Sequence, residues 1–181
     1  MKHFVGILWC ISAFLSLTTV QAQTKEAGPV ISEYGKVYKV ENPDIKVDTT
    51  KTYKLVFDIM NSPDDPSIRN ASIETAARFL NMHAQSGVPV DQLHVMLVVH
   101  NKASKDLANS KVYEEKYGVV NPNEGLINAL LEANVQIVFC GQSAASRGFP
   151  KEKLIPQVQL ALSAMTALSQ AQEDGYQLIK F

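Results

Sequence analysis

Apolar residues gather in short, nearly continuous runs from residue 54 onward. The three strongest runs are residues 54–60 (KLVFDIM), 93–100 (LHVMLVVH) and 135–140 (VQIVFC). Runs of β-branched and aromatic residues with hardly a polar break are typical of strands that are buried on both faces of a parallel sheet. The pattern therefore predicts three central strands.

Two weaker patterns complete the set of predicted strands. Residues 156–162 (PQVQLAL) alternate between polar and apolar positions, which predicts a fourth strand whose apolar positions are Val158, Leu160 and Leu162. Residues 176–181 (YQLIKF) follow Gly175 and predict an edge strand at the end of the chain.

Segments with helical periodicity lie between these strands, at residues 66–86, 101–116, 124–133 and 163–174. Asp65 followed by Pro66 is a typical helix start, and Ser163 is an expected N-cap. The segment 101–116 is polar with few apolar anchors, which predicts a surface helix or a lid. Strands that alternate with helices predict an α/β fold, with three layers (α/β/α) around a parallel sheet.

The first 53 residues follow a different pattern. Lys2 precedes the apolar run 4–17 and the small-residue site Val20-Gln21-Ala22, so residues 1–22 are expected to be a signal peptide, with an uncleaved anchor as the alternative. Residues 23–53 are punctuated by Gly, Pro, Asn and Asp, which predicts an extended arm over the domain or a neighbouring subunit, or else a disordered linker. The α/β domain then covers residues 54–181. A cleaved signal peptide predicts a periplasmic or secreted protein without stable membrane insertion.

Composition narrows the classes of function. The 181 residues are 46% hydrophobic and 19% charged, with a formal net charge of -1, as for one globular domain. Lys and Arg are scattered, so no footprint for nucleic acid or an anionic membrane is present. His83 and His94 are expected to be packing residues. No metal-ligand spacing occurs among the histidines beyond residue 22, only one cysteine accompanies them, and no Gly-rich phosphate loop is present, so we expect no metal and no cofactor.

Cys140 is the one cysteine beyond the predicted signal peptide. It ends the third central strand, Gly141 permits a tight turn, and Ser143 is a candidate N-cap of the helix that follows. Ligands bind at the carboxyl ends of strands in open α/β sheets, and a helix N-terminus favours a thiolate. His100 ends the second strand in the same way; if the two strands are neighbours, the imidazole and the thiol lie about one strand spacing apart. The alternatives are a buried structural cysteine and a packing histidine.

The chain resembles the DsrE/DsrF-like proteins, and specifically a secreted branch of them. The resemblance covers residues 29–181 and depends above all on Cys140-Gly141-Gln142-Ser143 followed by Arg147-Gly148, with support from Val98-Val99-His100 and Asn121-Pro122-Asn123. It implies a five-stranded parallel sheet in the order 4-3-2-1-5, which makes strands two and three neighbours. Asn101 and Asn134 stand where relatives often have glycine.

The resemblance also implies a function. In the best-understood relatives the matching cysteine carries sulfur as a persulfide, and the proteins form homo- or hetero-oligomers, commonly trimers or hexamers. Cys140 would accept sulfur, His100 would assist as a base or imidazolium, and the amides of Gly141, Gln142 and Ser143 would stabilise the thiolate. Arg147 would hold an anionic donor such as thiosulfate, or else be an ordinary surface arginine.

Two other classes of function stay open at this point. The chain could be a non-catalytic oligomeric module that binds a small ligand or a partner, with Cys140 inert. It could also be a redox sensor in which Cys140 pairs between subunits. The sulfur donor and the acceptor are not identified by the residues.

Overall fold

The computed structural model describes residues 23–180; the predicted signal peptide lies outside these residues. Five parallel strands form one sheet in the order β4-β3-β2-β1-β5. The predicted fold class and strand order are therefore confirmed. The strands are β1 (Tyr53–Ile59), β2 (Leu93–Val99), β3 (Gln136–Cys140), β4 (Gln159–Ala161) and β5 (Gln177–Ile179).

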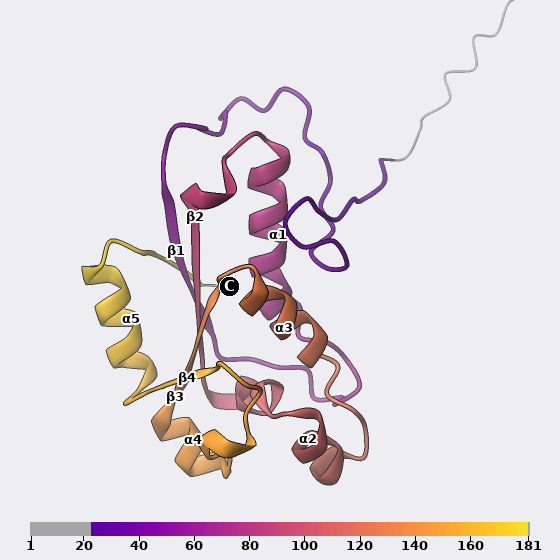
Figure 1. The fold of residues 1–181 in the computed structure, drawn as a ribbon, viewed down its shortest axis with the longest axis vertical. Helices are drawn as coiled ribbons and strands as arrows, with labels where there is room; N and C mark the ends of the chain where they lie inside the picture. The colour runs from indigo at the N-terminus through magenta and orange to yellow at the C-terminus, as the bar shows by residue number, and fades with distance from the viewer. Residues whose placement is uncertain (1–22, 181) are drawn as a thin grey trace, which may run out of the picture.

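Helices cover both faces of the sheet (Figure 1). α1 (Ala71–Gln85) and α3 (Glu124–Glu132) lie on one face, and α5 (Ala164–Glu173) lies on the other. Alternate strand residues face each way, so the larger core packs under α1 and α3, while a smaller cluster faces α5. That smaller cluster contains Val56, Val98, Val138 and Cys140 against three alanines of α5. The thiol of Cys140 therefore belongs to the α5 face.

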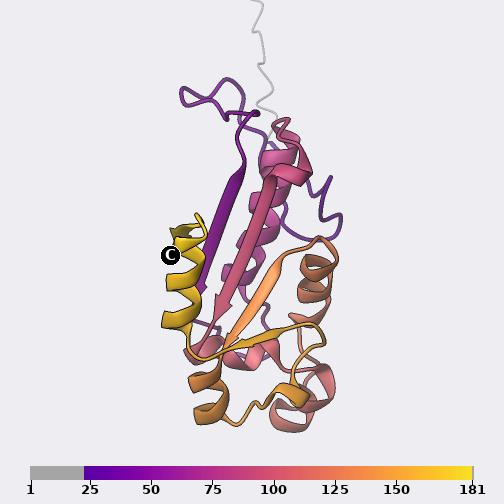
Figure 2. The ribbon, with the colours of Figure 1, turned by 60° about the vertical axis from the view of Figure 1, so that its left-hand side comes forward.

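Short helices gather at the carboxyl edge of the sheet, at the lower end of Figure 2. They are the 3-10 helix η2 (Asn101–Leu107), α2 (Ser110–Tyr117), α4 (Gly141–Arg147) and the 3-10 helix η3 (Lys151–Lys153). A further 3-10 helix, η1 (Val90–Gln92), precedes β2 at the amino edge. The carboxyl edge, where ligands bind in open α/β sheets, is thus the edge that carries most of the short helices.

The predicted start of the first helix at Pro66 is wrong. Asp65 accepts hydrogen bonds from the amide and the hydroxyl of Ser67, at 2.9 and 2.7 Å, and so closes a local turn. α1 begins at Ala71, because the side chain of Asn70 accepts a hydrogen bond from the amide of Ser72 at 2.9 Å. Asp65 before Pro66 thus forms a turn, and the N-cap of α1 is Asn70, five residues further along the chain.

The segment after β2 is not a surface helix or a lid along its first half. Ala103 and Leu107 of η2 are fully buried, and so is the carboxylate of Asp106. Asp106 accepts hydrogen bonds from Asn70 at 2.7 Å and from Lys105 at 3.1 Å. This network connects η2 to the start of α1, so η2 is a fixed part of the domain.

The fourth strand is present but shorter than predicted, and the prediction for His94 is wrong. β4 is only three residues long; Val158 is buried, but Leu160 and Leu162 are 44% and 73% exposed. The alternating pattern thus correctly predicted a strand, although two of its apolar side chains are exposed. His94, expected to pack, is exposed beside Lys54 at the start of β2. Ser163 does cap α5, accepting from the amide of Thr166 at 3.1 Å, and β5 is an edge strand as predicted.

The segment 23–52 lies against α1 of its own domain (Figure 1). Asn81, fully buried on α1, accepts hydrogen bonds from the amides of Val30 and Ile31 and donates to the carbonyls of Ile31, Tyr34 and Gly35. A Cβ at Gly35 would come within 2.5 Å of the backbone of α1, so only glycine permits this approach. Hydrogen bonds between the side chain of Asn81 and the main chain thus hold the arm against α1.

Candidate functional site

Cys140 is the last residue of β3 and the N-cap of α4, and 5% of its surface is exposed. α4 begins at Gly141 without a connecting loop. Ser143 is therefore not the N-cap that the sequence predicted; it lies in the first turn of the helix. This difference matters, because a first-turn hydroxyl faces back toward the residue that precedes the helix.

Hydrogen-bond donors surround the thiol from two helix starts. Burial raises the pKa of Cys140, but hydrogen bonds from the amide and hydroxyl of Ser143, and from the amides of Ala164 and Gln142, lower it more. The net pKa lies below its ordinary value of 9.0. Ala164 is the first residue of α5, so the starts of α4 and α5 both stabilise the thiolate.

Gly141 allows β4 to pass close to the start of α4. A Cβ at this position would meet the carbonyl oxygens of Ala161 and Leu162 at 2.6 and 3.1 Å. Gln142 also donates from Nε2 to the Leu162 carbonyl, at 3.3 Å. The role of Gly141 is thus close approach, and it brings α5, which starts just after Leu162, up to Cys140.

His100 follows β2, and its side chain lies on the same face of the sheet as Cys140. Its Nε2 atom is 2.7 Å from Asp58 Oδ1, on β1. The other carboxylate oxygen of Asp58 is 3.1 Å from Lys180 Nζ. The imidazole is therefore held toward β1, while Cys140 lies on β3, on the other side of β2. Sequence reasoning missed Asp58, although a lone carboxylate inside an apolar strand was a signal.

Asn101 connects η2 to α4 at two points. Its amide donates to the hydroxyl of Ser143 at 3.0 Å, and its side-chain oxygen accepts a hydrogen bond from Arg147. Its φ of 53° lies in the left-handed region, as does the φ of 61° at Asn134. Asparagine adopts this conformation more readily than most residues with a side chain, so both positions are accommodated without a glycine.

Arg147 is at the opposite end of α4 from Cys140. Its side chain lines a pocket with Lys102, Lys105 and Lys116 rather than the surroundings of the thiol. The structure thus brings together Cys140, Gly141, Gln142 and Ser143, sets His100 at the neighbouring strand end, and separates Arg147 from them.

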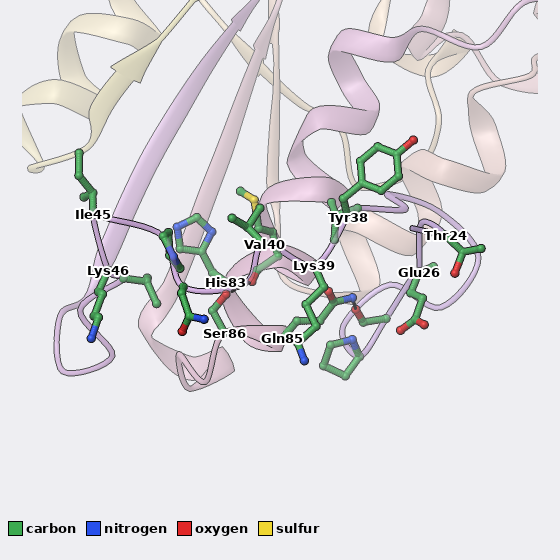
Figure 3. A pocket seen from close by; sticks show the side chains of 18 residues that line it. Thr24, Glu26, Tyr38, Lys39, Val40, Ile45, Lys46, His83, Gln85 and Ser86 are labelled. Atoms are coloured by element: carbon green, nitrogen blue, oxygen red, sulfur yellow. Dashed lines mark hydrogen bonds between the residues drawn. The ribbon is translucent and has the colours of Figure 1, made fainter. Parts of the chain in front are cut away.

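A groove of about 1010 Å³ lies between the arm and the C-terminal half of α1. Tyr38, Val40 and Ile45 of the arm and His83 of α1 line this groove (Figure 3). His83 is the predicted packing histidine: its Nδ1 atom is 2.9 Å from the Phe79 carbonyl oxygen, and burial lowers its pKa. This groove lies toward the amino edge of the sheet, away from Cys140.

The fold and the site define a class: an α/β protein with one buried thiol, polarised by backbone amides, at the carboxyl edge of a parallel sheet. Residues 23–180 contain neither a cluster of three His, Cys, Asp or Glu suited to a metal nor a helix long and apolar enough to cross a membrane. Residues 54–181 match the DsrE/DsrF-like family, and the chain belongs to it. This family is commonly linked to sulfur relay.

Two solved structures are similar in fold. One is the protein of unknown function MTH1491 from Methanobacterium thermoautotrophicum, with a TM-score of 0.55 and 15% identity. The other is the ychN protein from E. coli, with a TM-score of 0.52 and 18% identity. Each comparison covers 71% of this chain and 99% of the other chain. No curated protein matches the chain.

Proposed function

We propose that the protein is a thiol-based sulfur carrier or sulfurtransferase-like protein that holds a persulfide on Cys140. The Cys140 thiolate attacks the outer sulfur of thiosulfate, a Cys–S–S⁻ persulfide forms, and sulfite leaves with the electron pair of the broken S–S bond. An acceptor thiolate then attacks the outer sulfur of the persulfide, takes it as a new persulfide and releases the Cys140 thiolate. Neither step changes the total charge or needs a redox partner.

The observation that carries this proposal is the set of donors around the thiol. A thiolate is the nucleophile in sulfur transfer, and it is stabilised here by the amides of Gln142, Ser143 and Ala164 despite the burial of Cys140. The same donors suit a persulfide anion. His100, held by Asp58, is proposed to act at this edge as a base or an imidazolium that attracts the anionic donor.

Intact-mass spectrometry tests the proposal. After exposure to thiosulfate or polysulfide, the wild-type protein should gain the mass of one sulfur atom, the Cys140→Ser variant should gain none, and the His100→Ala variant should gain it more slowly. The same spectrum reports the N-terminus, which we propose to be Gln23 in the exported periplasmic or secreted protein. Sulfur loading that is undiminished in Cys140→Ser would contradict the proposed carrier.

A second candidate is a non-catalytic oligomeric module that binds a small ligand or a partner. The 5% exposure of Cys140 favours it, because a covered thiol meets few reagents. The two candidates differ in the reaction with iodoacetamide. A carrier thiol should be alkylated faster than a free cysteine at neutral pH, whereas an inert thiol should be alkylated only when the protein unfolds.

We also propose that the protein is a homo-oligomer, a trimer or a hexamer. Large apolar side chains are exposed on β4 and around the start of α5, beside Cys140: Leu160, Leu162 and Met165, the last 79% exposed. A second copy of the chain that packs on these residues would bury them and would complete the wall around the thiol.

A further inference from the structure

A basic pocket of about 470 Å³ lies at the end of α4 far from Cys140. Three separate elements, η2, α2 and α4, contribute cationic side chains to it. Hydroxyl groups of Ser62, Ser146 and Tyr117 also line it. The cationic residues of this basic pocket are Lys102, Lys105, Lys116 and Arg147.

Carboxylates offset only part of this charge. Lys105 is 3.1 Å from the buried carboxylate of Asp106 and belongs to the network that holds η2 in place. Lys102 is 3.5 Å from Asp64, but Asp64 is 94% exposed, so this pair is screened by water and contributes little. The lysines of η2 are thus the paired members of the cluster.

Lys116 and Arg147 have neutral partners. Lys116 Nζ is 3.5 Å from the carbonyl oxygen of Arg147 and 4.4 Å from the centre of the Phe149 ring. Arg147 donates to the side-chain oxygen of Asn101. Among residues 23–180, neither cation forms an ion pair with a carboxylate. The cluster therefore holds an excess of positive charge, in a chain whose net charge is -1.

We propose that the basic pocket binds a small dianionic oxyanion: sulfate, thiosulfate or phosphate, either free or as the end group of a larger molecule. The guanidinium of Arg147 supplies a planar pair of donors for two oxygens, and Lys116 supplies a second positive charge on a flexible side chain. The hydroxyl of Tyr117 is a further donor in the pocket. Because this site lies apart from Cys140, it does not depend on the sulfur-carrier proposal.

Isothermal titration calorimetry on the Cys140→Ser variant tests the site without sulfur transfer. Sodium sulfate, thiosulfate and phosphate are titrated at constant ionic strength, with sodium chloride as the reference. We expect saturable binding of one dianion per chain. Lys116→Gln should weaken it about tenfold, the effect of losing one charge-assisted hydrogen bond, and Arg147→Gln should weaken it at least as much.

Lys111→Gln is the matched control, because Lys111 is an exposed lysine of the same helix α2 outside the pocket. It should change the affinity less than about twofold, since a distant surface charge is screened. Phenyl phosphate distinguishes the two sources of the anion. If it binds more tightly than inorganic phosphate, the ligand is the end group of a larger molecule; if it binds no more tightly, the ligand is the free anion. The proposal fails if no dianion saturates the protein, if chloride competes equally, or if Lys111→Gln weakens binding as much as Lys116→Gln.

Discussion

Ser143 has two hydrogen-bonding partners at the site, one on each side of its hydroxyl group. The oxygen accepts from the amide of Asn101, which leaves the hydroxyl proton free to be donated to the Cys140 sulfur. The backbone amide of the same residue is a second donor to the sulfur. A hydroxyl that is oriented by a fixed segment stabilises a thiolate without first having to reorganise.

Ser143→Ala should raise the pKa of Cys140, because it removes a donor that favours the thiolate. The midpoint of the pH dependence of alkylation by iodoacetamide should move to higher pH by about one unit. At a pH below both midpoints the variant should therefore react more slowly than the wild type. The control is Ser146→Ala, which removes a hydroxyl about one turn further along α4. That hydroxyl donates to the Ser143 carbonyl and not to the Cys140 sulfur. An unchanged midpoint in Ser143→Ala would mean that the backbone amides alone stabilise the thiolate.

At this scale the sequence predicted the residues next to Cys140 better than those that meet it from elsewhere. Gly141, Gln142 and Ser143 are contiguous with the cysteine, so their contact follows from the start of a helix. Ala164 arrives from α5, more than twenty residues along the chain, through a backbone amide that no side-chain pattern reveals. Asp58 pairs with His100 across β1 and β2, and this contact depends on register.

At the level of elements, the site is formed where β4, α4 and the start of α5 come together. Gly141 lies against the carbonyl oxygen of Ala161, and α5 begins three residues beyond Ala161, at Ala164. The distance between α4 and α5, and hence the position of the two sets of amides around the sulfur, depends on the absence of a side chain at Gly141.

Gly141→Ala should therefore displace β4 or α4 and impair the site. Overpacking at this contact should lower the free energy of unfolding by about 2 kcal/mol, and alkylation of Cys140 should move to higher pH as the amide of Ala164 moves away. Gly148→Ala, at the other end of α4, meets no atom within 4 Å but strains a residue with a φ of 72°. It should destabilise the protein without changing thiol reactivity. Thermal unfolding measures the stability of the two variants, and alkylation by iodoacetamide measures the reactivity of Cys140. If the thiol reacts equally in both variants, the proposed role of Gly141 is contradicted.

Long apolar runs predicted the three central strands, because strands buried on both faces leave no polar positions to confuse the pattern. The sequence predicted the ends and the exposed faces of elements less well, because contacts between distant segments determine them. α1 starts at Ala71 because Asn70 joins a buried network with Asp106, which no local pattern contains. β4 kept its alternation but left Leu160 and Leu162 uncovered within the described chain. The exposure of these two leucines is explained by the proposed contact between copies of the chain.

For the whole molecule, this exposed apolar group predicts self-association. Leu162→Glu would place an unpaired carboxylate in the proposed contact between copies, at a cost of about 3 kcal/mol or more. Size-exclusion chromatography with light scattering should show a trimer or hexamer for the wild type and smaller species for the variant. Val90→Glu, at an apolar residue that is 52% exposed on η1 at the amino edge, should leave the mass unchanged. A monomeric wild type would refute the proposal.

The attachment of the arm has a consequence for how this protein can diverge. Asn81 bonds only main-chain groups of the arm, and the buried side chains of Ile31 and Val37 complete the attachment. Tyr38, Val40 and Ile45, by contrast, line the groove with their side chains and are largely exposed. Substitutions at these positions would change the chemistry of the groove at little cost in folding. The side chains of the arm that line the groove can thus change while the contacts that hold the arm to α1 stay the same.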